Sequence, residues 1–302
     1  MNWTGVFPAV TTKFTADDKL DLTNFNLNIQ AQVKAGVSGV ILGGTLGEAS
    51  SLSNDEKLIL LESAIVQVSG SIPVIVNIAE QTTKSAVELV KTIEDNGASG
   101  IMLLPPMRYA ADSRETLEYF KTVATATSLP IMIYNNPVDY KVPVTIEMFE
   151  VLLELENIQA VKESSRDITY MTRLRIAFGD RLKILSGVDN LALESLMMGA
   201  DGWVAGLVCA FPAETVAIYK LVQAGRHEEA RAIYKWFIPV LELDVHPKLV
   251  QYIKLAETMT GLGTENVRAP RLILEGDERK SVTEIINKAI ETRPELPDYL
   301  SL

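Results

Sequence analysis

Eight short apolar runs recur along the chain, and amphipathic segments separate them. The runs are Val6–Val10, Val40–Gly43, Pro73–Asn77, Gly100–Leu104, Pro130–Tyr134, Ile158–Lys162, Leu182–Ser186 and Gly202–Ala205. In the segments between them, apolar residues return every third or fourth position, which is typical of helices with one buried face. The clearest of these segments are Asn54–Val68, Thr83–Asn96, Arg114–Thr127 and Ile146–Leu155. The first has helix-start chemistry, with Ser53 or Asn54 as the cap and Glu56 in the first turn.

This alternation predicts an α/β fold. Strands that are apolar on both faces are typical of parallel sheets covered by helices, and eight repeats favour a (β/α)₈ TIM barrel over an open doubly wound sheet. After the eighth run the pattern becomes helical only, over Glu214–Ala224, Glu228–Leu243, Pro247–Thr260 and Val282–Glu291. We therefore expect a catalytic barrel over residues 1–223 and a C-terminal helical extension over 224–302, packed on the barrel or on a partner subunit.

Composition narrows the class of function. A chain of 302 residues with 47% hydrophobic content can bury a large core. Its net charge of −11 disfavours nucleic acid and anionic membranes as partners. The start of the chain lacks the pattern of a signal peptide, and no segment has the apolar length of a membrane span. With Cys209 as the single cysteine, no internal disulfide can form. We expect a cytoplasmic protein that acts on a small molecule.

The stretch IQAVKESS, residues 158–165, ends an apolar run with Lys162. Its ammonium group could reach a nearby surface, pair with Glu163, or be a desolvated amine kept for chemistry. Active sites of TIM barrels lie at the C-terminal ends of the strands, which is where this lysine is expected. Burial there would lower its pKa from the reference value of about 10.4 and leave an amine able to attack a carbonyl.

Other polar residues end apolar runs in the same way. Tyr134 closes the fifth run and would lie beside Lys162, although an ordinary barrel tyrosine would look the same. After the second run comes GGTLGEAS, in which Gly44 and Gly47 allow a tight turn and Thr45 precedes exposed N–H groups. Such a turn suits a carboxylate, but it could equally be a plain glycine-rich connection. Asn77 and the nearby Glu80 are further candidates, each with a structural alternative.

The motifs GGTLGEAS, YNNP and VKESS, in this order and spacing, resemble the dihydrodipicolinate synthase/N-acetylneuraminate lyase family. The resemblance extends from GVFPAVTTKF near the N-terminus to VRAP at Val267–Pro270. It implies a homotetrameric barrel in which Lys162 forms a Schiff base with a 2-oxo acid and needs no cofactor or metal. It also implies that Tyr134 relays protons and that the Thr45 and Leu46 backbone holds the substrate carboxylate.

The same resemblance implies further substrate contacts. Val204 matches the family residue whose carbonyl faces the Schiff base, and Gly187 lies in the loop after the seventh strand. The tyrosine that the family takes from a neighbouring subunit falls in PPMRYAAD, where Arg108 and Tyr109 both compete for the place. We include Gly44 and Asn77 among the expected contacts.

Two departures from the family pattern concern the substrate. Asp139 stands where dihydrodipicolinate synthases usually carry an arginine for the aldehyde substrate's carboxylate, and Leu46 replaces a second threonine. The motifs GTLGE and YNNPVDYK look more like the branch of 1-pyrroline-4-hydroxy-2-carboxylate deaminase, which acts on a cyclic imine carboxylate. The alternatives are 4-hydroxy-tetrahydrodipicolinate synthase and a 2-keto-3-deoxy sugar acid aldolase or dehydratase.

Readings outside this class are weaker. A pyridoxal-phosphate barrel would also use a lysine, but SGVDN and WVAGLV after the last two strands offer no phosphate cradle. A catalytically inactive 2-oxo acid binding protein would be expected to lack Lys162 or Tyr134. The two histidines, His227 and His246, fall in the helical extension, which disfavours a histidine-based metal site or triad.

Overall fold

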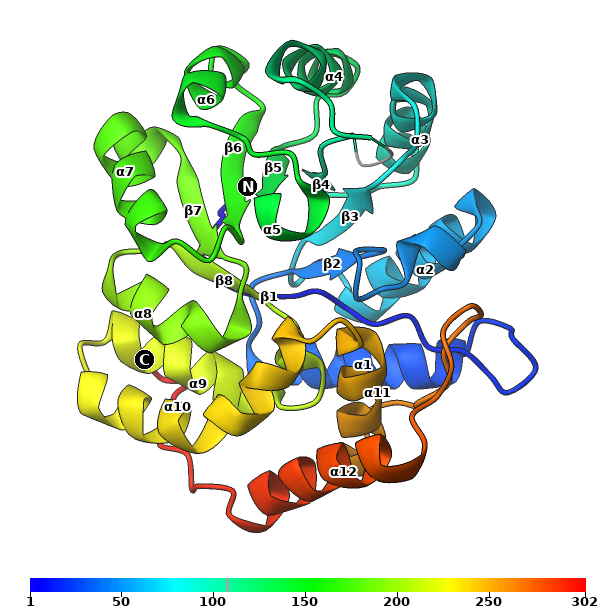
Figure 1. The fold of residues 1–302 in the computed structure, drawn as a ribbon, viewed down its shortest axis with the longest axis vertical. Coiled ribbons are helices and arrows are strands. Elements are labelled where there is room, and N and C mark those ends of the chain that lie inside the picture. Colours follow the sequence, from blue (N-terminus) through cyan, green and yellow to red (C-terminus); the bar gives the residue numbers. More distant parts are fainter. Residues whose placement is uncertain (107–108) are drawn as a thin grey trace.

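The computed structural model describes residues 1–106 and 109–302. Its centre is a ring of eight parallel strands, which Figure 1 shows surrounded by helices. The strands are β1 (Gly5–Pro8), β2 (Val40–Leu42), β3 (Val74–Ile78), β4 (Gly100–Leu103), β5 (Ile131–Asn135), β6 (Ile158–Glu163), β7 (Lys183–Ser186) and β8 (Gly202–Ala205). From β2 to β8 each strand pairs with the next one in chain order, and β8 pairs with β1.

A helix follows every strand, and further helices complete the C-terminal part. They are α1 (Leu22–Ala35), α2 (Asn54–Val68), α3 (Thr83–Asp95), α4 (Ser113–Thr125), α5 (Pro137–Tyr140), α6 (Ile146–Leu152), α7 (Ile168–Phe178), α8 (Ala192–Met197), α9 (Pro212–Gln223), α10 (His227–Leu241), α11 (Leu249–Thr260) and α12 (Gly276–Glu291). None of the helices in the described ranges is long and apolar enough to cross a membrane.

The ring closes between β1 and β2 through one parallel bridge, from Ala9 to Ile41, where the Val10 amide donates to the Ile41 carbonyl at 2.9 Å. Alternating strands and helices in a nearly closed parallel ring confirm the predicted (β/α)₈ TIM barrel. The predicted bounds agree best for α2, which begins after Ser53. That serine accepts from the Glu56 amide, and the Glu56 side chain accepts from the Ser53 amide, so both halves of a capping box are present.

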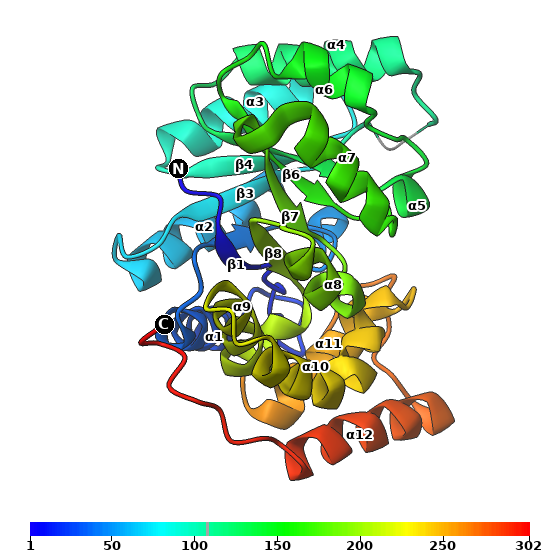
Figure 2. The ribbon, with the colours of Figure 1, turned by 90° about the vertical axis from the view of Figure 1, so that its left-hand side faces the viewer.

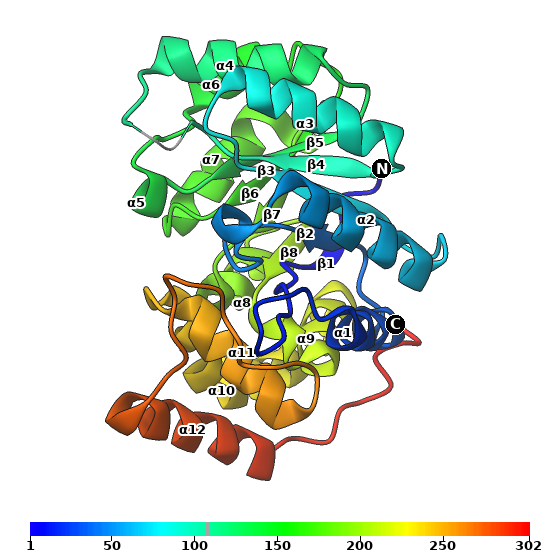
Figure 3. The same cartoon turned by 90° about the vertical axis from the view of Figure 1, so that its right-hand side faces the viewer.

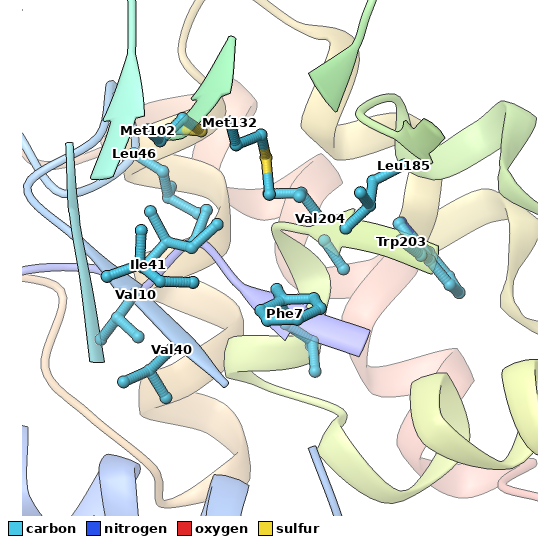
Figure 4. Close-up of a cluster of buried hydrophobic side chains, with 14 of the residues drawn as sticks. Phe7, Val10, Val40, Ile41, Leu46, Met102, Met132, Leu185, Trp203 and Val204 are labelled. Atoms are coloured by element: carbon cyan, nitrogen blue, oxygen red, sulfur yellow. The ribbon is translucent and has the colours of Figure 1, made fainter. Parts of the chain in front are cut away.

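The barrel interior is filled with apolar side chains. Figure 4 shows Phe7, Ile41 and Met132 converging there from three different strands. Leu46, Met102 and Val204 belong to the same buried core and also line the cavity described below. The apolar interior therefore ends directly under the site and forms its floor.

The C-terminal helices lie together beside the first and last strands. Figures 2 and 3 show α10 and α11 next to the barrel and α12 on the outside of both. Between α10 and α11 the chain makes a 3₁₀ turn over Glu242–Val245. This turn brings Asp244 and the following His246 to the same cavity as the strand ends.

Candidate active site

A cavity of 460 Å³ opens at the C-terminal ends of the strands. Its walls come from the loops after β2, β5, β6, β7 and β8, and the connection between α10 and α11 closes one side. Eight parallel strands all present this end to the same face, so side chains far apart in the sequence meet there. Of the predicted site residues, Lys162, Tyr134 and Thr45 all line this cavity.

Lys162 is 8% exposed, and its Nζ lies 4.2 Å from the centre of the Tyr134 ring. The reading in which it reaches the surface is therefore excluded. The pairing with Glu163 is absent as well. Glu163 instead accepts from the Asn135 amide group at 2.7 Å and from the Ser165 backbone at 2.6 Å. Successive side chains of β6 point to opposite faces, which separates the two residues.

Burial lowers the pKa of Lys162, opposed in order by Tyr140, Asp244, Asp189 and Asp139. The ring of Tyr134 stabilises a cation less than a carboxylate would, so desolvation dominates. A lowered pKa gives a larger fraction of neutral amine, which is the nucleophilic form.

Gly187 lies against the stem of this lysine. A Cβ at position 187 would come within 2.7 Å of Lys162 Cγ and 2.8 Å of Cε. Only glycine leaves room for the lysine to extend into the cavity. The predicted site residue Gly187 therefore shapes the path of the side chain.

Tyr134 is adjacent to Lys162 on the neighbouring strand and is 7% exposed. Its hydroxyl accepts from Asn136 Nδ2 at 3.2 Å. Burial raises its pKa to about 12, with hydrogen bonds from Asn136 and Ser164 acting in the opposite direction. The phenol thus stays protonated at neutral pH and can donate a proton.

The loop after β2 carries Gly44, Thr45 and Leu46 into the cavity wall. It is held from below by Asn77, whose amide donates to the Gly43 carbonyl at 3.0 Å. We expected Asn77 among the substrate contacts, and the structure places it under this loop instead. The loop is tight at Gly47, where a Cβ would lie 2.9 Å from the Val10 carbonyl oxygen.

Glu48 anchors the same loop to the C-terminal part. Its carboxylate binds the ammonium group of Lys254 in α11 and accepts from the Arg268 backbone at 3.1 Å. Two of the sequence motifs, GGTLGEAS and VRAP, therefore meet in space. The anchor holds Thr45 at the cavity although Thr45 itself is exposed.

The short helix α5 supplies residues on the other side of the opening. Asn136 caps it by accepting from the Asp139 amide at 3.2 Å, and its own amide group donates to Asp139 Oδ2 at 2.7 Å. Asp139 is exposed and lines the cavity. Tyr140, which the sequence analysis did not single out, lines the cavity and forms a 2.6 Å hydrogen bond with Thr45 Oγ1.

Further cavity residues also escaped the sequence analysis. Asp244 lies against Gly206, and burial holds its pKa well above the usual range. The buried Asp189, which also raises the pKa of Asp244, accepts from the Trp203 indole at 2.9 Å and the Leu207 backbone at 2.7 Å. His246 was not among the predicted site residues, and the structure shows that it lines the cavity.

Arg166 adds a guanidinium group to the cavity lining. Its φ of 64° is in the left-handed region, which is costly for a residue with a side chain. Arg166 directly follows the VKESS motif. A charged residue at this position, just after the end of a strand, was the feature of the sequence that could have indicated it as a site residue.

The remaining predicted contacts lie in different places. Val204 is buried and lines the cavity. Tyr109 is 57% exposed and borders a different pocket together with Glu80 and Tyr119. Arg108 lies outside the described residues. Within the two described ranges, no group of three or more His, Cys, Asp or Glu side chains is arranged to hold a metal ion.

Comparison with known proteins agrees with this geometry. Residues 2–289 match the model of the dihydrodipicolinate synthetase family. The 4-hydroxy-tetrahydrodipicolinate synthase of Exiguobacterium sibiricum is 35% identical over 273 residues, covering 89% of this chain and 91% of that protein. The 4-hydroxy-tetrahydrodipicolinate synthase 1 of Halalkalibacterium halodurans is 30% identical, covering 95% and 97%.

Solved structures give the same result. The 4-hydroxy-tetrahydrodipicolinate synthase of Methylacidiphilum fumariolicum has a TM-score of 0.91 at 26% identity, over 95% of this chain and 96% of that one. Fold, motif order and a family match over nearly the whole length all agree, and the resemblance seen in the sequence is confirmed: the chain belongs to the dihydrodipicolinate synthetase family.

Proposed function

We propose that this chain, a Schiff-base lyase of the dihydrodipicolinate synthetase family, uses Lys162 to form an imine with a small 2-oxo acid or cyclic imine carboxylate. The observation that carries the proposal is the buried amine of Lys162, placed beside the Tyr134 ring in a cavity that also contains the Thr45 loop. The neutral amine attacks the substrate carbon, and the resulting carbinolamine loses its hydroxyl as water to give the imine. The protonated imine then accepts electrons from the adjacent carbon, which loses a proton and becomes an enamine.

Within this class we propose 1-pyrroline-4-hydroxy-2-carboxylate as the substrate. Lys162 attacks the ring C=N carbon, the bond from that carbon to the ring nitrogen breaks, and the freed nitrogen takes a proton. Loss of a proton from the neighbouring carbon gives an enamine, which expels the 4-hydroxyl; with one proton it leaves as water. Proton shifts move hydrogens from the amine and its carbon to the unsaturated carbons, which turns that amine into an imine. Two water molecules then hydrolyse the two C=N bonds. The net reaction consumes one water and releases ammonia.

The cavity suits this chemistry in two respects. Expelling hydroxide needs a proton donor, and the hydroxyls of Tyr134, Tyr140 and Thr45 are all in the cavity wall. The substrate has a single carboxylate, so it needs no cation at the opening, where Asp139 is exposed. Asp139 would repel the carboxylate of aspartate semialdehyde bound next to pyruvate.

4-Hydroxy-tetrahydrodipicolinate synthase is the second candidate. It is favoured by the names of the relatives and by Arg166, whose guanidinium lines the cavity and can bind a carboxylate in place of the missing arginine. A 2-keto-3-deoxy sugar acid aldolase or dehydratase would use the same lysine. An inactive 2-oxo acid binding protein would bind pyruvate and release no product.

One panel of substrates separates these candidates. Purified protein is incubated with the hydroxylated pyrroline carboxylate, with pyruvate plus aspartate semialdehyde, and with sugar acids, while ammonia and pyruvate are both measured. We expect ammonia from the first and no synthase turnover in a coupled reductase assay. Synthase turnover in the ordinary enzyme range, on the order of 1–10³ s⁻¹, would establish the second candidate instead.

Asp139→Arg and Arg166→Gln sharpen the result. If Asp139 excludes the aldehyde substrate, Asp139→Arg gains weak synthase activity. If Arg166 binds the second carboxylate, Arg166→Gln raises KM for aspartate semialdehyde and leaves pyruvate binding unchanged. We also propose that the chain acts as a cytoplasmic homotetramer with domains 1–223 and 224–302, which light scattering and limited proteolysis can test.

A further inference from the structure

Tyr140 is placed where a proton relay would need it. Its hydroxyl lies 2.6 Å from Thr45 Oγ1, and either oxygen can be the donor. Its ring meets the Tyr134 ring edge-on, with 5.5 Å between the ring centres. Tyr140 therefore packs its ring against Tyr134, the residue beside Lys162, and bonds its hydroxyl to Thr45 of the β2 loop.

The backbone fixes this position. Helix α5 is a single turn over Pro137–Tyr140, and it is capped by Lys141, whose φ of 62° ends the helix. Asn136 binds both the helix start and the Tyr134 hydroxyl, so the two tyrosines are held by the same side chain and the same short helix. A tyrosine at the last position of such a turn has little freedom to leave the site.

We propose that Tyr140 is a proton-relay residue that links Thr45 to Tyr134 within one chain. This inference rests on the proposed Schiff-base function of Lys162. When the carbinolamine loses water, Tyr134 gives its proton to the departing hydroxyl. Tyr134 regains a proton from Tyr140, Tyr140 regains one from Thr45, and Thr45 regains one from solvent. The three hydroxyl groups end the step in their starting protonation states, and the proton taken from solvent is balanced by the positive charge of the protonated imine at Lys162.

If Tyr140 is part of the relay, a single chain contains all three hydroxyl groups of the site. Tyr109 is the described tyrosine in the segment from which a neighbouring subunit would be expected to contribute, and in this chain it borders a separate pocket. With Tyr140 bonded to Thr45, the hydroxyl needed next to Thr45 comes from the same chain. The relay then does not depend on a partner subunit.

The test compares two measurements on pyruvate. Borohydride trapping on Lys162, followed by mass spectrometry, reports imine formation. The rate at which the pyruvate methyl group takes up deuterium from D₂O, followed by NMR, reports how fast water leaves the carbinolamine and protons then move on the imine. We expect Tyr140→Phe to trap pyruvate to within about twofold of the wild-type extent and to exchange the methyl protons on the order of 10²-fold more slowly.

Tyr219→Phe is the matched control. It also removes one tyrosine hydroxyl that bonds to a single oxygen, here the Asp201 carbonyl at 3.1 Å, far from the cavity lining. Its exchange rate should equal that of the wild type. Thr45→Val should slow exchange like Tyr140→Phe, and the double variant should be no slower than the slower single variant, because both residues act in one path.

Three results would overturn the inference. The first is an exchange rate in Tyr140→Phe within twofold of wild type, and the second is full additivity in the double variant. The third is a loss of exchange in Tyr109→Phe with none in Tyr140→Phe, which would assign the hydroxyl to the other tyrosine. If the wild-type protein traps no pyruvate at all, the Schiff-base function itself fails, which is a separate and recognisable outcome.

Discussion

Two regions of this protein bury lysines, and they do so differently. In the region between the barrel and α11, Lys13 Nζ lies 2.7 Å from Glu257 Oε1, and Lys254 pairs with Glu48; all four side chains are fully buried. In the cavity, Lys162 faces the ring of Tyr134, and none of the ion pairs in the described part of the chain includes it.

The presence or absence of a carboxylate partner distinguishes a structural lysine from one available for chemistry. A buried ammonium group with a carboxylate partner stays in one place and holds two segments together. Even there, burial lowers the pKa of Lys254 to about 8, although Glu48 acts in the opposite direction. Lys162 has no such partner in contact, which leaves its amine free to bond to a substrate. The missing partner, more than burial itself, supports the proposal that Lys162 is the reactive lysine.

Replacing Lys162 tests this comparison with the largest expected effect. Lys162→Met and Lys162→Arg should both give no borohydride adduct with pyruvate and no turnover, because neither side chain can provide a neutral amine. Unfolding by urea should show Lys162→Met to be at least as stable as the wild type, since no carboxylate is left unpaired. An adduct on another residue would show that the reactive lysine lies elsewhere.

Tyr134→Phe should slow turnover by roughly 10²–10⁴-fold while borohydride trapping on Lys162 persists. The hydroxyl moves protons, and the ring alone maintains the packing against the lysine. Steady-state rates and trapping, measured on the same preparation, check this. An unchanged turnover number would reduce Tyr134 to a packing role.

Glu257→Gln acts on the paired region. It leaves the Lys13 ammonium group buried without its carboxylate, which costs about 3–5 kcal/mol of the free energy of unfolding. Trapping per folded molecule should not change, because neither residue lines the cavity. Glu229→Gln, in an exposed pair with Arg226, is the control and should leave the urea midpoint unchanged. Equal effects of the two changes would contradict the contrast drawn above.

The pH dependence of imine formation gives the smallest effect. Below the pKa of Lys162, the fraction of neutral amine falls about tenfold for each unit by which the pH is lowered. The rate of trapping should therefore rise as the pH is increased. Because burial lowers this pKa, the rate should level off below about pH 10.4, the value for an exposed lysine. Stopped-flow mixing with pyruvate measures the curve. A rise that continues beyond that pH would mean that Lys162 is not desolvated in solution.

The sequence predicted the strands well because their pattern is local. Runs that are apolar on both faces have few structural alternatives, and a helix with a strong cap, such as α2 after Ser53, has a defined start. Strand ends were less certain. The first strand ends at Pro8 and the sixth continues to Glu163, because pairing with neighbouring strands decides where a strand stops.

The sequence predicted the site residues at strand ends and missed those that come from other elements of the fold. Lys162 and Tyr134 follow from their position in a barrel. Asp244 and His246 reach the cavity through a turn between α10 and α11, and no local pattern shows where that turn lies in space. Tyr140 was visible in YNNPVDYK, but the direction of its hydroxyl depends on the single turn of α5.

Helix α5 has a consequence for how relatives of this protein can diverge. Its four residues, Pro137–Tyr140, carry both the charge at the opening and the hydroxyl bonded to Thr45. They are separate from β6, the strand that carries Lys162. If Asp139 and Tyr140 act as proposed, exchange of this one turn between relatives alters which compound is accepted without a change in the barrel. Helix α5 could be replaced as a unit in protein engineering, and substitutions in the same four residues are available to natural selection.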